Sequence, residues 1–298
     1  MGIESLSTPI LSTVHKEPPK NFGHGEVTFM RSAPDAIKTD MSTDAPVIPL
    51  LFVQGHGQDP TLERYLQLFA QTGRDTVGVS FTGRRTSTDS RLENVDGMDS
   101  QAAPYQVEKA EDMIAAMNAA GIGQTDIIAT SEGALRAMIA IAKYPDRFRN
   151  ILLVHPAGMD DKGYIRTHLR VAYHYGRKAL RSLITPRKPR EDGIAGGAEG
   201  FKDKGLRETR VEQKTVARTK FDMLIPELTA ANPHLLFSMV GDSKDGVYPA
   251  ERLKHINGPY LFEFMTSEWD GHGIGIRQDR VNQLDTMLTR MERSRSRK

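Results

Sequence analysis

The sequence contains no cysteine, a single tryptophan and no apolar run that approaches the length of a membrane span. The absence of cysteine excludes disulfide frameworks, cysteine nucleophiles and thiolate metal sites, and it fits a reducing compartment. A transmembrane helix needs about 20 predominantly apolar residues. The first residues carry neither a secretory signal nor a myristoylation pattern, because Leu6 stands where that pattern needs serine or threonine. We therefore expect a soluble, cytoplasmic protein with no integral membrane segment.

An excess of charge of one sign is also missing. The 40 lysines and arginines nearly balance the 38 acidic residues, and the formal net charge of +2 is too small to indicate nucleic-acid binding by the whole molecule. The nine histidines include no His-Glu-x-x-His motif, and no Gly-x-Gly-x-x-Gly opens a helix after a strand. We therefore expect no metal and no other cofactor.

The chain has 298 residues, of which 38% are hydrophobic and 26% charged, so it can form one large α/β domain with an insertion or two small domains. Short apolar runs typical of buried strands alternate with segments of helical periodicity. The strand candidates are 26–30, 46–53, 76–81, 127–129, 150–155, 234–240 and 260–265, and the helix candidates are 61–70, 106–120, the segment after 131, and 277–291. This alternation predicts an α/β fold with a doubly wound, mostly parallel sheet.

The alternation is interrupted once, between the fifth and the sixth strand candidates, where no buried strand is recognisable but helical segments are. We therefore predict an N-terminal arm, loosely attached, at 1–24, a core at 25–158 and 233–293, a helical lid at 159–232, and a basic, solvated tail at 294–298. Within the lid, Arg170 and Arg177 belong to a basic helical stripe. This stripe either faces solvent or attracts anionic substrates or an anionic membrane surface.

Ser131 stands at an abrupt change of pattern. The apolar run Ile127-Ile128-Ala129 leads up to it, and a helical pattern begins directly after it. Small flanking residues allow the strand and helix backbones to approach closely, which would hold the serine on a strained corner. The unpaired N–H groups of the helix N-terminus could then bind a developing oxyanion. The alternative interpretation is that Ser131 only caps the helix.

A serine hydroxyl needs a base to take its proton, and the base needs an orienting partner. In a parallel sheet these groups belong in the loops at the carboxyl ends of the strands. Asp242 and Asp245 follow one strand candidate, and His272 follows the next. The chain order Ser, Asp, His is the order found in α/β-hydrolases.

Four sequence blocks carry a resemblance to the α/β-hydrolase superfamily, in its lid-containing form, over residues 25–292. They are His56-Gly57 after a buried strand, Thr130-Ser131-Glu132-Gly133 with the helix that follows, Asp245 followed by Pro249, and Gly271-His272. Two departures stand out. Ala129 replaces the glycine usual two positions before the nucleophile, and the acid loop after Gly241 is one residue longer than usual.

The resemblance implies a role for each matching residue. Ser131 would be the nucleophile, His272 the general base and acid, and Asp245 the residue that orients His272, with Asp242 as the alternative acid. The backbone N–H groups of Gln58 and Glu132 would form the oxyanion hole, supported by His56 and Gly57. For the Glu132 carboxylate itself, at the N-terminus of a helix, we expect a capping role favoured by the helix dipole.

The implied function is that of a serine hydrolase, carboxylesterase-like, which cleaves an ester-like bond of a small or medium-sized substrate through an acyl-enzyme. Thioester, lactone, amide and C–C substrates share the same triad and stay open. A different class also stays open, because some proteins of this fold retain the triad but act as ligand receptors or binding proteins with slow or absent turnover. The sequence carries no signal of oligomeric state.

Overall fold

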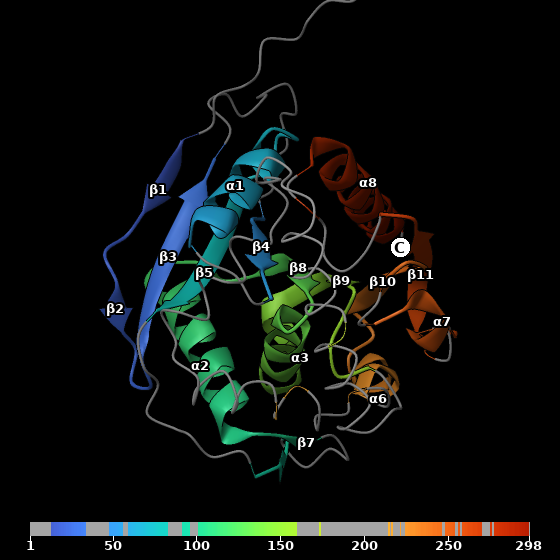
Figure 1. Ribbon diagram of the computed structural model, residues 1–298, viewed down its shortest axis with the longest axis horizontal. Helices are drawn as coiled ribbons and strands as arrows, with labels where there is room; N and C mark the ends of the chain where they lie inside the picture. The colour runs from blue at the N-terminus through green and yellow to red at the C-terminus, as the bar shows by residue number, and fades with distance from the viewer. Residues whose placement is uncertain are drawn as a thin grey trace, which may run out of the picture.

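The computed structural model describes residues 13–33, 48–55, 59–82, 91–95, 101–159, 173, 214, 216, 221, 224–245, 248–253, 256, 258–269, 275 and 277–297. These residues form a central sheet with helices on both of its faces (Figure 1). The predicted lid, 159–232, lies for the most part outside the described residues, so its form and its basic stripe stay predictions. A short helix near its end, α6 (Leu224–Ala231), is described.

The sheet has the order β1-β3-β5-β4-β8-β9-β10-β11, with β2 paired to β3. Its strands are β1 (Val14–Lys16), β2 (Lys20–Asn21), β3 (Glu26–Ser32), β4 (Leu50–Val53), β5 (Thr76–Thr82), β8 (Thr125–Thr130), β9 (Phe148–Val154), β10 (Leu236–Asp242) and β11 (Leu261–Ser267). Strands β5, β4, β8, β9, β10 and β11 are parallel, whereas β1, β2 and β3 join antiparallel. A separate two-stranded sheet pairs β6 (Glu93–Asn94) with β7 (Gln101–Ala102). The predicted doubly wound, mostly parallel sheet is confirmed.

The chain reverses its direction of winding between β4 and β8. From β4 it moves to the neighbouring β5 through helix α1 (Asp59–Ala70). It then returns through helix α2 (Pro104–Ala119) to β8, on the other side of β4. In open parallel sheets such a switch point leaves a crevice at the carboxyl ends of the strands, which is where ligands bind. Ser131 directly follows β8, so it stands at this switch point.

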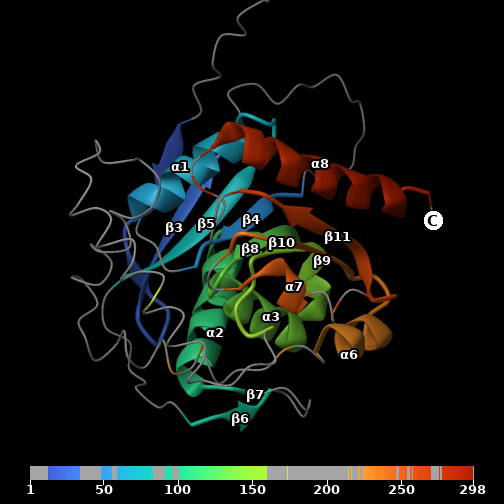
Figure 2. The same cartoon turned by 45° about the vertical axis from the view of Figure 1, so that its right-hand side comes forward.

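Two helical layers cover the sheet. Helices α1 and α8 (Gln278–Arg295) lie side by side on one face, and α2, α3 (Gly133–Lys143) and α6 cover the other (Figures 1 and 2). Successive residues of a buried strand belong alternately to the two cores, although nearly all of these residues are apolar. Leu51 and Val53 pack with the α2 and α3 side chains, whereas Leu50 and Phe52 pack with α1 and α8. Among the described residues there are also η1 (Pro145–Arg147), of the 3₁₀ type, and α7 (Ala250–Leu253).

The described parts of both terminal segments, from residue 13 and up to residue 297, are more regular than the sequence predicted. We expected regular structure to begin near Gly25, but β1 and β2 already pair with β3, and this expectation is wrong for residues 14–21. The strands are too short and too polar for their alternation to be recognisable in the sequence. The prediction of a solvated tail at 294–298 is also wrong at its start, because α8 continues to Arg295. That side chain donates to Asn150 Oδ1 and to the main-chain oxygen of Arg149, both at 2.8 Å.

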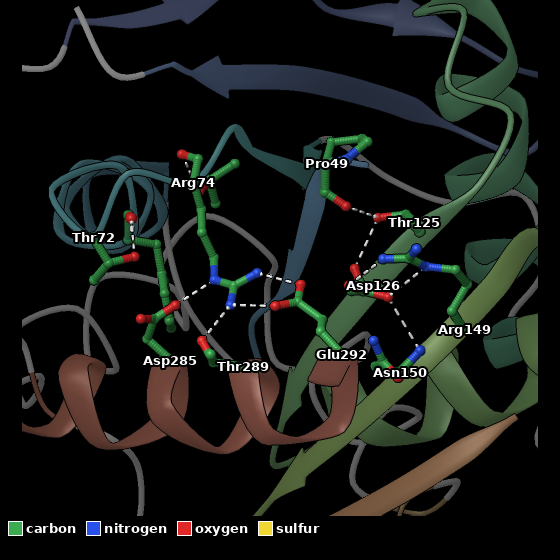
Figure 3. Close-up of polar contacts among 12 residues, drawn as sticks. Pro49, Thr72, Arg74, Thr125, Asp126, Arg149, Asn150, Asp285, Thr289 and Glu292 are labelled. Atoms are coloured by element: carbon green, nitrogen blue, oxygen red, sulfur yellow. Dashed lines mark hydrogen bonds and ion pairs between the residues drawn. The ribbon is translucent and has the colours of Figure 1, made fainter. Parts of the chain in front are cut away.

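Polar contacts fasten the amino-terminal ends of the parallel strands. Arg74, just before β5, reaches Glu292 of α8 at 2.8 Å and also contacts Asp285 (Figure 3). At the start of β8, Arg149 donates two hydrogen bonds to the buried Asp126 carboxylate, at 3.0 and 2.8 Å. These networks lie at the opposite ends of the strands from Ser131, so they stabilise the scaffold without taking part in the site.

Candidate active site

Ser131 occupies a strained corner between β8 and α3. Its φ of +50° lies in the left-handed region, which residues with a Cβ atom rarely adopt. Its N–H donates to the carbonyl of Val154 at 3.0 Å, and its own carbonyl accepts from Ala134 and Ala157, at 3.1 and 3.0 Å. The corner is therefore fixed by backbone hydrogen bonds on both sides. The N-cap residue of α3 is Glu132, so Ser131 stands one position before the cap.

Two glycines allow the end of β4 to touch this corner. A Cβ atom on Gly55 would lie 2.8 Å from the Cβ of Ser131 and 3.0 Å from the carbonyl oxygen of Thr130. A Cβ atom on Gly133 would lie 2.4 Å from the carbonyl oxygen of Val53. At 2.8 and 2.4 Å, the Cβ atoms would come closer to these neighbours than a carbon atom tolerates, so only glycine fits at either position. The close approach of backbones predicted from the small residues is confirmed, and the small Ala129 is fully buried and compatible with it.

The Glu132 side chain does not cap its helix. The N-cap position has no side-chain hydrogen bond to the helix backbone, so the capping role that we expected for this carboxylate is wrong. Instead the carboxylate turns toward α2, where Gln106 Nε2 lies 3.1 Å and Lys109 Nζ 3.5 Å from Oε1. The buried positive charge of Lys109 and the Gln106 donor on the neighbouring helix attract the side chain more strongly than the partial charges of the helix end. Its backbone N–H stays at the start of α3, beside Ser131.

Arg136, one turn into α3, binds the end of β4. Its Nη2 donates to the main-chain oxygens of Gln54, at 2.8 Å, and of Gly55, at 3.3 Å. The guanidinium carbon lies 4.9 Å from the centre of the Phe81 ring, and the residue is only 4% exposed. The helix that follows Ser131 therefore holds the strand end from which the predicted oxyanion loop departs.

Asp242 and Asp245 are both buried, but they do different things. The Asp242 carboxylate accepts from the N–H groups of Lys244, at 2.6 Å, and Trp269, at 2.5 Å, and from Ser267 Oγ at 3.3 Å. It thereby joins the loop after β10 to the end of β11. Asp245 Oδ1 accepts from the N–H of Tyr248 at 3.0 Å.

His155, at the end of β9, connects the corner of Ser131 with the acid loop. It shares the positive φ, at +47°, and its N–H donates to the carbonyl of Val240 at 2.8 Å. Its Nδ1 lies 3.9 Å from Asp245 Oδ2, and both side chains are fully buried. The strand ends of β8, β9 and β10 thus carry Ser131, His155 and the acid loop next to one another.

The other predicted site residues, His272, Gln58, His56 and Gly57, lie outside the described residues. Topology still gives the strands that they follow. His272 comes after β11, which is the neighbour of β10, and Gln58 comes after β4, which is the neighbour of β8. The strands that lead to the predicted oxyanion loop and nucleophile, β4 and β8, are neighbours, and so are those that lead to the predicted acid and base, β10 and β11; only β9 lies between the two pairs.

Solved structures of the same architecture exist. No family model and no curated protein matches this sequence. A carboxylesterase of Nitrososphaera gargenis is 14% identical with a TM-score of 0.60, and the match covers 93% of this chain and all (100%) of that one. The chain has the α/β-hydrolase fold.

Two further structures share this α/β-hydrolase architecture. The enol-lactonase of Burkholderia xenovorans LB400 is 9% identical with a TM-score of 0.57, covering 91% of this chain and 97% of that chain. A serine hydrolase of Cycloclasticus zankles, a bacterium that degrades polyaromatic hydrocarbons, is 15% identical with a TM-score of 0.58, covering 95% and 98%. At such identities the likeness concerns the fold alone.

The sequence does not predict the burial of Lys109 and Arg136 beside Ser131, and for His155 it predicts only a cap at the end of its strand. The exposed fractions of the side chains near Ser131 are 1% for Lys109, 4% for Arg136 and 0% for His155. Long charged side chains are usually exposed, so residue type alone gives no reason to expect the first two to be buried. The available signal for Arg136 was its place among apolar residues in the segment after Ser131. Within the described part of the chain, no group of acidic and histidine side chains could hold a metal ion, and no helix is both long and apolar enough to cross a membrane.

Proposed function

We propose that the protein is a serine hydrolase that cleaves ester-like bonds through an acyl-enzyme on Ser131. One observation carries the proposal: Ser131 has a positive φ at the carboxyl end of β8, at the topological switch point, with glycines on both approaching segments. A strained backbone that several contacts hold in place is typical of a functional residue. A serine that served only the helix would not need this corner.

In the proposed reaction, His272 takes the proton of the Ser131 hydroxyl as its oxygen attacks the carbonyl carbon of the substrate. The negative charge that develops on the carbonyl oxygen is stabilised by the backbone N–H groups of Glu132 and Gln58. His272 then protonates the leaving alcohol, and the acyl group stays on Ser131. Water, deprotonated by the same histidine, releases the acid and restores the serine.

Asp245 is our choice for the residue that orients His272. Asp242 already accepts three local hydrogen bonds that join two loops, which suits a structural carboxylate. Asp245 lies further along the loop, and its carboxylate is anchored by the N–H of Tyr248 at one oxygen. A carboxylate fixed in this way can hold an imidazole in one tautomer and stabilise the imidazolium during the reaction.

The similar solved structures favour an ester as the substrate. The similar structures named above include a carboxylesterase and an enol-lactonase, and a lactone is a cyclic ester. Both bonds react by the same attack on an acyl carbon. We therefore propose a small or medium-sized ester or lactone as the substrate.

The decisive experiment is labelling with a fluorophosphonate, which modifies a serine only when it is activated. We expect one label on the intact protein, located on Ser131 by peptide mass spectrometry, and hydrolysis of p-nitrophenyl esters with a preference among acyl chain lengths. The Ser131→Ala variant, which should fold normally, is the control and should lose both. A folded protein that takes no label and turns over no ester would contradict the proposal and favour a ligand-binding role.

A further inference from the structure

A buried ion pair stands directly behind the corner of Ser131. Lys109 of α2 and Glu132, the residue after the proposed nucleophile, are 1% and 2% exposed, with Nζ and Oε1 3.5 Å apart. Gln106, one turn earlier on α2, donates to the same oxygen at 3.1 Å. The Lys109 ammonium also lies 4.4 Å from the centre of the Tyr105 ring and 5.9 Å from that of Phe81. The pair is therefore enclosed by aromatic rings and a helix rather than by water.

The position of this carboxylate creates an electrostatic problem for the proposed reaction. Glu132 supplies the backbone N–H that would stabilise the oxyanion, so its own negative charge lies within one residue of the charge that develops. In a buried site, where the effective dielectric constant is low, like charges at this range repel strongly. An uncompensated carboxylate at Glu132 would oppose the oxyanion that its main chain is meant to bind.

We propose that Lys109 is a positioning residue for catalysis: it neutralises the Glu132 carboxylate and, with Gln106, holds Glu132 so that its N–H points at the oxyanion. The inference rests on the proposed function and deepens it, because it assigns α2 a part in the oxyanion hole. Aromatic rings contribute to holding the ammonium in place, since their faces attract cations. The role assigned to the lysine acts through Glu132 and not through contact with the substrate.

The test is a pair of substitutions measured with a p-nitrophenyl ester and with fluorophosphonate. Removing a full oxyanion donor costs about 100- to 1,000-fold in kcat in other enzymes. In Lys109→Met the oxyanion donor would be misplaced and would lie beside an unpaired charge. We therefore expect kcat and the labelling rate to fall about 10- to 100-fold, with KM changed less than about threefold. The double variant Lys109→Met/Glu132→Gln removes both charges and keeps the oxygen that Gln106 binds. It should recover to within about fivefold of the wild-type kcat.

Lys143→Met is the matched control. Lys143 of α3 pairs with Glu111 of α2, so it links the same two helices, but at the far end of α3 from Ser131. We expect it to lower the free energy of unfolding slightly and to leave kcat unchanged. If Lys109 contributed to stability alone, Lys109→Met and Lys143→Met would have the same effect on kcat.

Three results would overturn the inference: a folded Lys109→Met with wild-type kcat, a double variant no more active than Lys109→Met, or a loss of kcat in the control of the same size. A lysine variant that fails to fold leaves the double variant to decide, because a folded double variant reduced about 100-fold would refute charge compensation. Wild-type protein that takes no label refutes the proposed function instead, which separates the two failures.

Discussion

Arg136 Nη2 donates a hydrogen bond to the main-chain oxygen of Gln54, 2.8 Å away. This contact joins the helix behind the proposed nucleophile to the strand end that precedes the predicted oxyanion loop. A charged donor that is 4% exposed makes a stronger hydrogen bond to a carbonyl than a neutral one does. The two halves of the proposed oxyanion hole, one on each side of the switch point, are thus mechanically coupled.

Substituting Arg136→Met should therefore weaken catalysis as well as the fold. We expect the free energy of unfolding to fall by about 1.5–3 kcal/mol, the typical value for a hydrogen bond to a charged group. We expect kcat to fall by about tenfold or more, because the carbonyls of Gln54 and Gly55 lose their donor. Urea unfolding and ester hydrolysis give the two numbers.

Arg74→Met is the control for this prediction. Arg74 is also largely buried and binds Glu292 and Asp285, but at the amino-terminal ends of the strands. Its loss should lower stability by a similar amount and leave kcat per folded molecule unchanged. A parallel loss of kcat in both variants would show that Arg136 acts through stability alone.

Gly133→Ala tests the corner itself. The added methyl group would lie 2.4 Å from the carbonyl oxygen of Val53 and 2.7 Å from that of Gln54. Neither is the end of a flexible side chain, so α3 and the corner must shift. Overpacking of this kind costs about 1–3 kcal/mol, and a displaced Ser131 should lose at least about 100-fold in labelling rate, since small misplacements cost that much.

Gly123→Ala provides the comparison for the glycine, because a Cβ atom there meets nothing within 4 Å. We expect its labelling rate to equal that of the wild type. Equal labelling of Gly133→Ala would mean that the corner tolerates displacement, and that the close approach of β4 is not needed for the reactivity of Ser131.

The sheet could be predicted from the sequence because its evidence is local. All seven predicted strand segments occur, with ends shifted by a few residues, since a run such as Ile127-Ile128-Ala129 is recognisable without knowledge of its neighbours. The half-exposed strand Val14–Lys16 lies at the sheet edge and carries no such run. Its pairing depends on β3, which the sequence around it does not indicate.

The location of the corner was predictable, but the side chains behind it were not. Ser131 was found from a break in periodicity. Lys109 and Glu132 are 23 positions apart, and their pairing depends on how α2 packs against α3. Periodicity identifies the apolar face of a helix. It does not indicate which charged side chain is buried on that face, because this depends on an ion-pair partner that lies on another helix. For the same reason the sequence predicts a helix cap for Glu132, because the helix end is the one partner visible in its own segment.

The two aspartates of the acid loop offer a separation of catalysis from stability. Asp245→Asn should leave the fold intact and lower kcat by about 10⁴-fold, as loss of the orienting carboxylate does in serine proteases. Asp242→Asn should do the reverse. One of its two oxygens would become an NH₂ group facing a donor, at Lys244 or at Trp269 and Ser267, which costs about 1–3 kcal/mol of stability.

The same two variants decide between the acids in one experiment. Thermal or urea unfolding measures the structural effect, and kcat with a p-nitrophenyl ester measures the catalytic one. Loss of kcat in Asp242→Asn at full stability, with an active Asp245→Asn, would transfer the orienting role to Asp242. The Asp242 carboxylate also holds the start of the loop that leads to His272, so in that outcome Asp242 would serve the histidine both through contact and through the path of the chain, and Asp245 would have no part in catalysis.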